Sequence, residues 1–466
     1  MHQMVRTSAD QSRRWLVLAI VVAAQFMFGV DAFIVNVALP TIANDLNASP
    51  AQVEAVIAIY LIGYGTLVVT GGRLGDIHGT KQVFIAGVFG FSVTSLWCGL
   101  TQSGPELIIA RLAQGATAAL MVPQVLATIH VLFNDEARAR AFAIYGIVLG
   151  LAGAAGFALG GVLVGLNLAG FGWRAVFFVN IPAGIVIILA ALRWMPAPPA
   201  RQNTRLDIPG AITLFVALLC LIGPLLFGHD VGWSPAVWLV MLAGVGVMAA
   251  FLGLERRLAA RGGIPLIDLV LLKDDVFMRG LAAVFLFFFA NLSFYLVVTL
   301  YLQADLKVAP LHAGLVFLPL AIAFVIASRH SAVRAKAKGT RVLIEGCAVQ
   351  ITALAALFLL TTAVSTPSVG LLTAALIVFG YGQGLVMAPL SGVVLASVPA
   401  ASAGAGSGIY GTTTQIANAA GVAAIGALQA AVQIAVSGRA AFAASLIACA
   451  ISIALCGACL AWMRRG

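Results

Sequence analysis

Two charged residues lie deep inside long apolar stretches. Asp31 follows the uncharged run WLVLAIVVAAQFMFGV, 15–30, and Arg111 lies in another apolar run, 106–130. An ionised side chain at the centre of a bilayer costs about 2.5–3.5 kcal/mol on insertion scales, so such residues usually have a function. A nearby guanidinium favours an ionised carboxylate, whereas burial favours the protonated one. A carboxylate that alternates between these states is suited to proton coupling.

The depths of Asp31 and Arg111 predict that the two side chains meet. At 1.5 Å per residue, Asp31 lies roughly 10 Å before the end of the first apolar run, and Arg111 lies roughly 8–9 Å after the start of the fourth. These two runs cross in opposite directions, so both charges lie at a similar level. We expect an ion pair or a shared water-filled cavity; the alternative is that each residue makes separate polar contacts.

Other polar residues in the apolar runs are candidates for the lining of a substrate cavity. Most of them recur at intervals of three or four residues, which places them on one face of a helix. The candidates are Asn36, Tyr60, Tyr64, Gln114, Asn291, Tyr295, Gln415 and Asn418. The same spacing suits hydrogen bonds between neighbouring helices, so both interpretations stay open.

Membrane-spanning helices must position these residues. The chain has 466 residues, is 62% hydrophobic and only 9% charged, and has a mean hydropathy of +1.07. A helix of about 20 apolar residues crosses a bilayer. We therefore predict an all-α integral membrane protein with fourteen transmembrane helices. The predicted spans are 15–38, 53–72, 82–101, 106–130, 141–165, 175–194, 208–228, 236–254, 280–301, 309–328, 342–363, 369–395, 406–434 and 441–463.

The basic residues predict the orientation. With both termini in the cytoplasm, nearly all lysines and arginines fall in cytoplasmic segments. Only Arg174, Lys307 and Arg439 fall on the opposite side, and Arg111 lies within a span. This bias follows the positive-inside rule. It predicts a multi-pass protein of the cytoplasmic (inner) membrane, with the lipid bilayer as its surroundings.

Several other classes of protein are excluded by the sequence. The net charge of +10 comes from scattered cations rather than a basic patch, so we expect no nucleic-acid partner. We find no HExxH, P-loop or paired catalytic carboxylates, and expect no enzyme, no catalytic residue and no metal site. The CxxC formed by Cys456 and Cys459 lies in an alanine-rich run without acidic or histidine partners, which favours packing over metal or redox chemistry.

A weak internal similarity predicts two halves. The sequence GTK at 79–81 follows the second span and matches GTR at 339–341, which follows the tenth. This spacing suggests two six-helix bundles with a two-helix insert, a layout common among transporters. The predicted domains are an N-terminal bundle at 1–195, a linker with two extra helices at 196–275, and a C-terminal bundle at 276–466.

Five motifs resemble those of the fourteen-span drug:proton antiporters of the major facilitator superfamily. They are DAFIVNVALP at 31–40, GRLGDIHGTK at 72–81, RLAQGATAA at 111–119, GWRAVFFVNIPAG at 172–184 and YLQADLKVAPLHAGLVFLP at 301–319. The resemblance implies a major facilitator fold and proton-coupled efflux of drugs, biocides or toxic metabolites by alternating access. It implies no cofactor, with protons as the coupling ion and Asp31 and Arg111 as the coupling residues.

The resemblance also indicates residues for conformational gating. In the loop motif these are Gly72, Asp76, Gly79 and Lys81, while Ile77 and Thr80 replace two arginines that are usual there. In the fifth span, a glycine face offers either a sliding contact between the halves or ordinary close packing. The glycines concerned are Gly146, Gly150, Gly153, Gly156, Gly160 and Gly161. Phe157 takes the place of a usual proline in this span, which weakens the indication of antiport.

The sequence does not identify the chemical class of the cargo. Apart from Asp31, the acids fall near the ends of spans, so neutral or zwitterionic amphiphiles fit as well as cations. Two alternatives also stay open: export of one specific metabolite or antibiotic, and a non-transporting sensor with the same fold. Whether a periplasmic adaptor is a further partner also stays open.

Overall fold

The computed structural model describes residues 2–133, 135–167, 170–196, 206–228, 230–263, 265–267, 270–364, 367–398 and 403–463. Within these ranges the regular elements are all helices. The first nine are α1 (His2–Leu46), α2 (Pro50–His78), α3 (Thr80–Leu100), α4 (Gly104–Leu132), α5 (Asp135–Leu166), α6 (Ala175–Phe178), α7 (Asn180–Trp194), α8 (Ile208–Phe227) and α9 (Pro235–Ala260). The others are α10 (Asp275–Leu300), α11 (Pro310–Leu315), α12 (Phe317–Lys338), α13 (Thr340–Ala363), α14 (Val369–Leu395), α15 (Ala403–Ala435) and α16 (Gly438–Met463).

Fourteen segments of the described chain are long and apolar enough to cross a membrane, which confirms the predicted number. The first of them, Arg13–Leu46, is longer than the predicted span 15–38. The helix continues through Pro40 and the polar residues that follow it. Hydropathy alone underestimates this length because a helix can extend past the apolar part of its sequence.

Three spans combine more than one helical element. A short 3₁₀ helix, Gly172–Arg174, leads into α6 and α7 and completes the span Gly172–Trp194. Helix α10 continues as a π-helix at Tyr301–Asp305 (η4). Helix α11 leads into α12 within the span Pro310–Ser331. Such irregular turns change the direction of the side chains that follow them.

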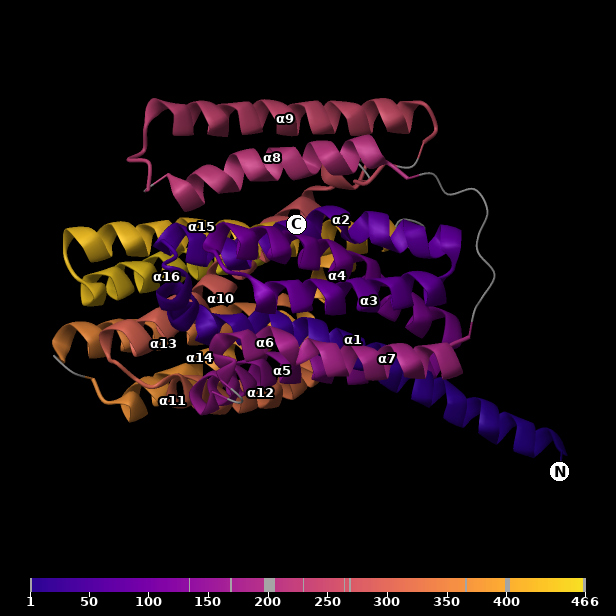
Figure 1. The fold of residues 1–466 in the computed structure, drawn as a ribbon. Helices are drawn as coiled ribbons and strands as arrows, with labels where there is room; N and C mark the ends of the chain where they lie inside the picture. Colours follow the sequence, from indigo (N-terminus) through magenta and orange to yellow (C-terminus); the bar gives the residue numbers. More distant parts are fainter. Residues whose placement is uncertain are drawn as a thin grey trace.

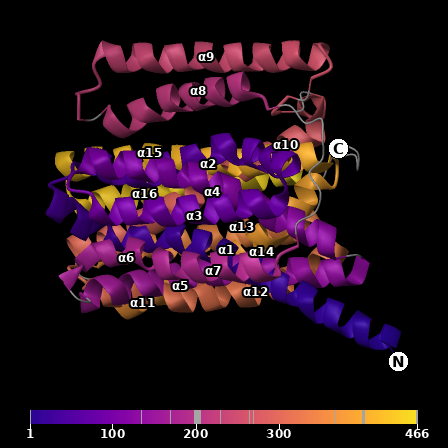
Figure 2. The same cartoon turned by 45° about the vertical axis from the view of Figure 1, so that its right-hand side comes forward.

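The helices run along a common direction in one bundle (Figures 1 and 2). Helices α8 and α9 form a hairpin at one side, with α8 packed against α2 and α15 and α9 outermost. Helix α9 exposes large apolar side chains, among them Trp238, Leu239 and Leu242. An apolar outer face of this kind is expected where a helix meets lipid.

Buried apolar residues form two clusters. The first lies mainly within α1–α9, and the second mainly within α10–α16. We call these two groups of helices the N-terminal and C-terminal halves. Helix α2 packs along α15, and α5 packs along α11 and α12, so these pairs bring the two halves together.

The two ends of the bundle are named by helix α1. The distal end is the end of the bundle at which α1 ends with Leu46. The proximal end is the opposite one, near Trp15, where the first span begins. The halves meet closely near the distal end. Gly161 of α5 lies against the carbonyl oxygens of Pro310 and Leu311, so that a methyl group there would come within 2.9 and 3.1 Å of them. Gln303 Nε2 also donates a hydrogen bond of 3.0 Å to the carbonyl oxygen of Val37.

Candidate functional site

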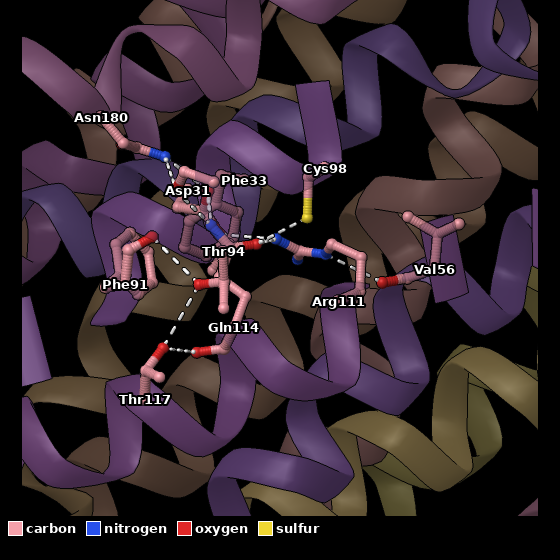
Figure 3. Close-up of polar contacts among 12 residues, drawn as sticks. Asp31, Phe33, Val56, Phe91, Thr94, Cys98, Arg111, Gln114, Thr117 and Asn180 are labelled. Atoms are coloured by element: carbon pink, nitrogen blue, oxygen red, sulfur yellow. Dashed lines mark hydrogen bonds and ion pairs between the residues drawn. The ribbon is translucent and has the colours of Figure 1, made fainter. Parts of the chain in front are cut away.

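Asp31 and Arg111 form a buried ion pair. Arg111 Nη1 lies 2.7 Å from Asp31 Oδ2, and the two side chains are 1% and 0% exposed (Figure 3). The predicted pairing is confirmed. The removal of two charges from water is unfavourable unless further hydrogen bonds satisfy the remaining polar atoms.

Two amides supply those further bonds to Asp31. Gln114 Nε2 donates to Oδ1 over 3.0 Å, and Asn180 Nδ2 donates to the same oxygen over 2.8 Å (Figure 3). The Ser95 hydroxyl oxygen accepts bonds of 2.7 and 3.2 Å from the same two amide nitrogens. The carboxylate therefore has donors on both oxygens, and the donors are themselves held in place.

The guanidinium of Arg111 has partners besides Asp31. Its Nε donates to the carbonyl oxygen of Val56 over 3.1 Å, and its Nη1 also donates to Gln114 Oε1 over 2.6 Å. The guanidinium carbon lies 4.0 Å from the centre of the Tyr60 ring, which is close enough for a cation–π contact. Arg111 would thus keep several contacts if Asp31 lost its charge.

Close packing of α2 and α4 places Arg111 and Gln114. These two residues are three positions apart in the RLAQGATAA motif and face the same side of α4. Gly115, the next residue, lies against the carbonyl oxygen of Tyr60 and the backbone nitrogen of Tyr64 in α2. A side chain at position 115 would collide with the α2 backbone, so glycine is required for this approach.

The motif GWRAVFFVNIPAG, 172–184, supplies a part of the site that sequence reasoning missed. Trp173 Nε1 donates to Asp45 Oδ2 over 2.9 Å, and Arg174 Nη1 donates to the same oxygen over 2.6 Å. These bonds tie the motif to the distal part of α1. Along the following turns, the centre of the Phe177 ring lies 5.7 Å from the guanidinium carbon of Arg111. Asn180 then donates its hydrogen bond to Asp31. An asparagine within an otherwise apolar run was the available signal.

Ser95 and Cys98 on α3 were also missed. Ser95 lies between the amides of Gln114 and Asn180. Cys98, labelled in Figure 3, has its Sγ 3.6 Å from Gln114 Oε1. Both residues are small and only weakly polar, and such residues are common in packed membrane helices. Their types alone therefore gave no functional signal.

A small cavity lies between the two halves, and aromatic rings dominate its wall. Its volume is about 60 Å³, less than the 300–1,000 Å³ of typical ligand pockets. The Phe157 and Phe317 ring centres are 4.2 Å apart, and Tyr295 lies 5.0 Å from Phe157. The lining residues are Phe33, Gly153, Phe157, Tyr295, Phe317, Leu320, Ala321, Phe324, Gln383 and Met387, none of which is charged.

A chain of polar side chains leads away from this cavity. The Tyr295 hydroxyl donates to Gln383 Oε1 over 2.8 Å, and Gln383 Nε2 donates to Asn291 Oδ1 over 3.0 Å. Asn291 Nδ2 is buried with no hydrogen-bond partner in the described chain. Of the predicted cavity candidates, the structure thus brings Tyr295 to the cavity wall and Asn291 close behind it.

The other candidates lie elsewhere. Asn36 is buried and donates bonds of 3.2 Å to the carbonyl oxygens of Ala32 and Phe33 in its own helix. Tyr60 and Gln114 belong to the ion-pair site, and Tyr64 packs 4.8 Å from the ring of Phe28. Gln415 lies against Gly65, and Asn418 is half-buried on α15. None of these six lines the cavity.

The carboxylate of Asp31 does not line the cavity either. It is fully buried within the N-terminal half, whereas Phe33, two residues further along α1, is part of the cavity wall. Cargo in this cavity would therefore not touch the Asp31 carboxylate in this arrangement. The two sites share helix α1, which is therefore a direct structural connection between them.

Comparison with known proteins gives the family. Residues 21–422 match the sequence model of the Major Facilitator Superfamily. This match covers most of the chain.

The chain belongs to the major facilitator superfamily.

Two relatives within the superfamily carry names that describe transport or export. The chain is 34% identical over 422 residues to the "Probable actinorhodin transporter" of Streptomyces coelicolor, covering 90% of this chain and 72% of the relative. It is 30% identical to the "Tetracenomycin C resistance and export protein" of Streptomyces glaucescens, with 91% and 77% covered. Both are similar proteins of the same family. The chain is therefore a membrane transporter rather than an enzyme.

A solved structure supports the superfamily fold. A bacterial homologue of the human lysosomal transporter Spinster, crystallised in an inward-facing and occupied conformation, aligns with a TM-score of 0.70. The alignment covers 97% of both chains at 16% identity. At this level of identity the comparison shows the fold alone.

The loop motif, 72–81, covers the last turns of α2, Gly79 and the start of α3. Gly79 ends α2 and precedes α3 with φ +93°, a conformation that favours glycine. Lys81 Nζ donates to the carbonyl oxygen of Leu192 over 2.9 Å, while Asp76 is exposed. Gly72 faces Pro123, and a methyl group there would lie 3.7 Å from the proline ring. The motif thus joins the proximal ends of α2, α3 and α7.

The glycine face of α5 contacts mainly α1, within the same half. Gly153, Gly156 and Gly160 lie against Phe33, Val30 and Ile34 respectively. A methyl group at Gly146 would meet no atom within 4 Å. The contacts of Gly150 are not among those that the structure describes. Gly161 has its nearest neighbours in the C-terminal half, and Gly153 also lines the cavity between the halves. For Gly153, Gly156 and Gly160 the structure favours close helix packing over a sliding contact between the halves.

Proposed function

We propose that this transporter exports small amphiphilic drugs, biocides or toxic metabolites in exchange for protons by alternating access. The observation that supports this proposal is the Asp31 carboxylate, which is 0% exposed, lies within a membrane span and receives hydrogen bonds from three side chains. Titratable groups held in this way within a transmembrane segment are typical of proton pathways. The proposal needs no cofactor besides the proton.

In the proposed cycle, protonation neutralises Asp31 and weakens its ion pair with Arg111. The guanidinium keeps its bonds to Val56 and Gln114 and its contact with the Tyr60 ring, so Arg111 has a stable arrangement without Asp31. The site therefore has two states that differ by one proton. A two-state element that both proton and cargo can bias is what coupling requires.

Helix α1 is the proposed link between proton and cargo. Asp31 lies on one side of this helix, and Phe33 lies in the cavity wall. Gly156 of α5 lies against Phe33 Cβ and the Val30 carbonyl oxygen, at 2.8 and 2.9 Å from the position a methyl group would take. In the proposed cycle, α1 shifts against α5 at this close contact when the Asp31 bonds change. Movement of α1 would then alter the cavity.

The orientation follows the distribution of basic residues. We place the proximal end in the cytoplasm and the distal end outside, with both termini cytoplasmic, in the inner membrane. The lipid bilayer, the amphiphilic cargo and the proton are then the partners, and a periplasmic adaptor stays an open addition. The distal contact between the halves closes the outer side in this conformation.

The cavity favours cargo with aromatic surfaces and no obligatory positive charge. Its lining offers rings and the polar groups of Tyr295 and Gln383, but no carboxylate. Rings of this kind contribute about 0.5–1.5 kcal/mol per stacked pair beyond the buried area. With a cavity of about 60 Å³, the halves must separate before a drug-sized molecule can enter.

A second candidate is the export of one specific compound. Each of the two relatives described above is named for a single compound, actinorhodin or tetracenomycin C. A panel of dyes, biocides and antibiotics separates the two candidates, because a multidrug exporter lowers the accumulation of many unrelated compounds. A non-transporting sensor would lower none of them.

Everted membrane vesicles test the proposal. Addition of a substrate should dissipate a preformed pH gradient with the wild type and not with Asp31→Asn. Asp275→Asn is a matched control, because Asp275 is 86% exposed and lies 3.8 Å from Arg279 in a surface pair. Unchanged exchange in Asp31→Asn would overturn proton coupling at this residue.

A further inference from the structure

A second buried carboxyl group lies at the contact between the two halves. Glu54 on α2 is only 4% exposed, and its Oε2 has no hydrogen-bond partner in the described chain. The side chain lies against Gly426 of α15 so closely that a methyl group on Gly426 would overlap the carboxyl carbon and both carboxyl oxygens. Glu54 is therefore enclosed by the opposite half near the distal end.

No cation from the neighbouring helices compensates a charge on Glu54. Helices α8 and α15 contain no charged residue. On α1 and α4, the distal charges have other partners: Asp45 accepts from Arg174, Arg111 pairs with Asp31, and Glu106 accepts from Trp97. On α3 the only charged residue is Lys81, near the proximal end, where it donates to Leu192.

A second acid lies beside the first turn of α2, the helix that carries Glu54. Asp230 follows α8, and the Ser49 hydroxyl donates to its Oδ2 over 2.7 Å. Further along the same face of α15, Gln429 Oε1 is another buried oxygen without a partner. Glu54 Oε2 and Gln429 Oε1 are thus two buried acceptors to which no donor of the described chain is bonded, and a proton on Glu54 would supply a donor at this contact.

We propose that Glu54 is a proton-binding site that controls closure of the distal contact between the two halves. In the closed arrangement the carboxyl group is almost fully buried and lacks a cationic partner, and an ionised carboxylate there is strongly disfavoured. When α2 and α15 separate, water reaches Glu54 and the ionised form becomes acceptable. Closure is therefore linked to uptake of one proton.

This proposal rests on the proposed function only in so far as the halves alternate between two arrangements. In the cycle, a proton from the outer side binds Glu54 and permits the distal end to close behind the released cargo. The same proton leaves on the same side when the contact reopens. Glu54 thus responds to the outer pH, whereas Asp31 is the residue proposed to exchange its proton with cargo.

The experiment measures the distance between the two halves at different pH values. Labels are attached to cysteines introduced by Leu166→Cys at the end of α5 and Val436→Cys after α15, both of which are exposed distal positions. The two half-buried native thiols, Cys220 and Cys459, are first replaced by serine. With one linked proton, the open-to-closed ratio should rise with pH by up to about tenfold per pH unit.

The decisive variant is Glu54→Gln, which keeps the shape and removes the charge. It should stay closed at all pH values, as should Glu54→Ala, which serves if the glutamine variant does not fold. Glu106→Gln removes another distal carboxyl that lies outside the contact between halves, and it should respond to pH as the wild type does. A wild type without pH response, a folded Glu54 variant that retains it, or its loss in Glu106→Gln would each overturn the proposal.

The result of this distance experiment can be told apart from the result of the exchange assay on Asp31→Asn. The distances are measured without substrate, and the pH response should persist in Asp31→Asn, where coupled exchange is expected to stop. If Asp31→Asn still exchanges protons for cargo, the proposed function fails while the role of Glu54 can stand. If Asp31→Asn loses the distance response, the role assigned to Glu54 is overturned.

Discussion

Asn180 donates a hydrogen bond of 2.8 Å to Asp31, although 149 positions separate the two residues in the sequence. The bond joins the first residue of α7 to α1. It gives the carboxylate a third donor beside Arg111 and Gln114. Asn180 therefore belongs to the proposed coupling site as a positioning residue.

Substitution of Asn180 should change the pH dependence of exchange. A hydrogen bond to a charged group contributes about 1.5–3 kcal/mol, and in Asn180→Ala the ionised carboxylate loses that support. The half-maximal point of exchange should move to higher pH, as measured by substrate-induced proton movement in vesicles. Asn418→Ala, which changes a half-buried amide outside the site, should leave the profile in place. An identical profile in both variants would remove Asn180 from the site.

The ion pair should show strong energetic coupling in a double-mutant cycle. Removal of one partner of a buried pair costs about 3–5 kcal/mol because the other charge stays buried and unpaired. Asp31→Asn and Arg111→Gln should each lower the free energy of unfolding by this order. The double variant should lose less than the sum, as measured by denaturant unfolding in detergent. Simple additivity would show that the two charges do not depend on each other.

Removal of the central aromatic ring should weaken binding of aromatic cargo. Phe157 contacts the rings of Phe33, Tyr295 and Phe317, so Phe157→Ala removes three ring contacts. A fluorescent aromatic dye should bind at least about tenfold more weakly, equivalent to about 1.4 kcal/mol. Phe89→Ala is the control, since Phe89 is 62% exposed on α3. Equal dye affinities in the two variants would place the cargo elsewhere.

Two glycines on α5 should respond in opposite ways to alanine. Gly156→Ala inserts a methyl group against Phe33 and Val30, and overpacking of this kind destabilises by about 1–3 kcal/mol. At Gly146 a methyl group has open space, and alanine is favoured over glycine within a helix by about 0.5–1 kcal/mol. The midpoint temperature of thermal unfolding should therefore decrease for Gly156→Ala and stay the same or increase for Gly146→Ala. A matching decrease in both variants would mean that close packing is not the reason for glycine at position 156.

The fold was largely predictable from the sequence, because crossing a membrane imposes a one-dimensional requirement. Fourteen runs of sufficient length and hydropathy gave the number of spans and their order. The ion pair was also within reach, since depth along a straight helix follows from residue number and Asp31 and Arg111 fell at one level. Span ends were less certain: α1 continues well past residue 38 because helix formation does not stop where the apolar run stops.

The tertiary structure decided which helix faces meet, and the sequence holds little direct information about that. In the sequence, Glu54 is an acid near the end of a span. The contact with Gly426 of α15 in the structure shows that its carboxyl group is enclosed. The glycine face of α5 was visible, but its partner α1 was not. Hydropathy measures the free energy of moving each segment into lipid, one segment at a time. Contacts between segments depend on helix rotation and crossing, which are set jointly by side chains that lie far apart in the chain.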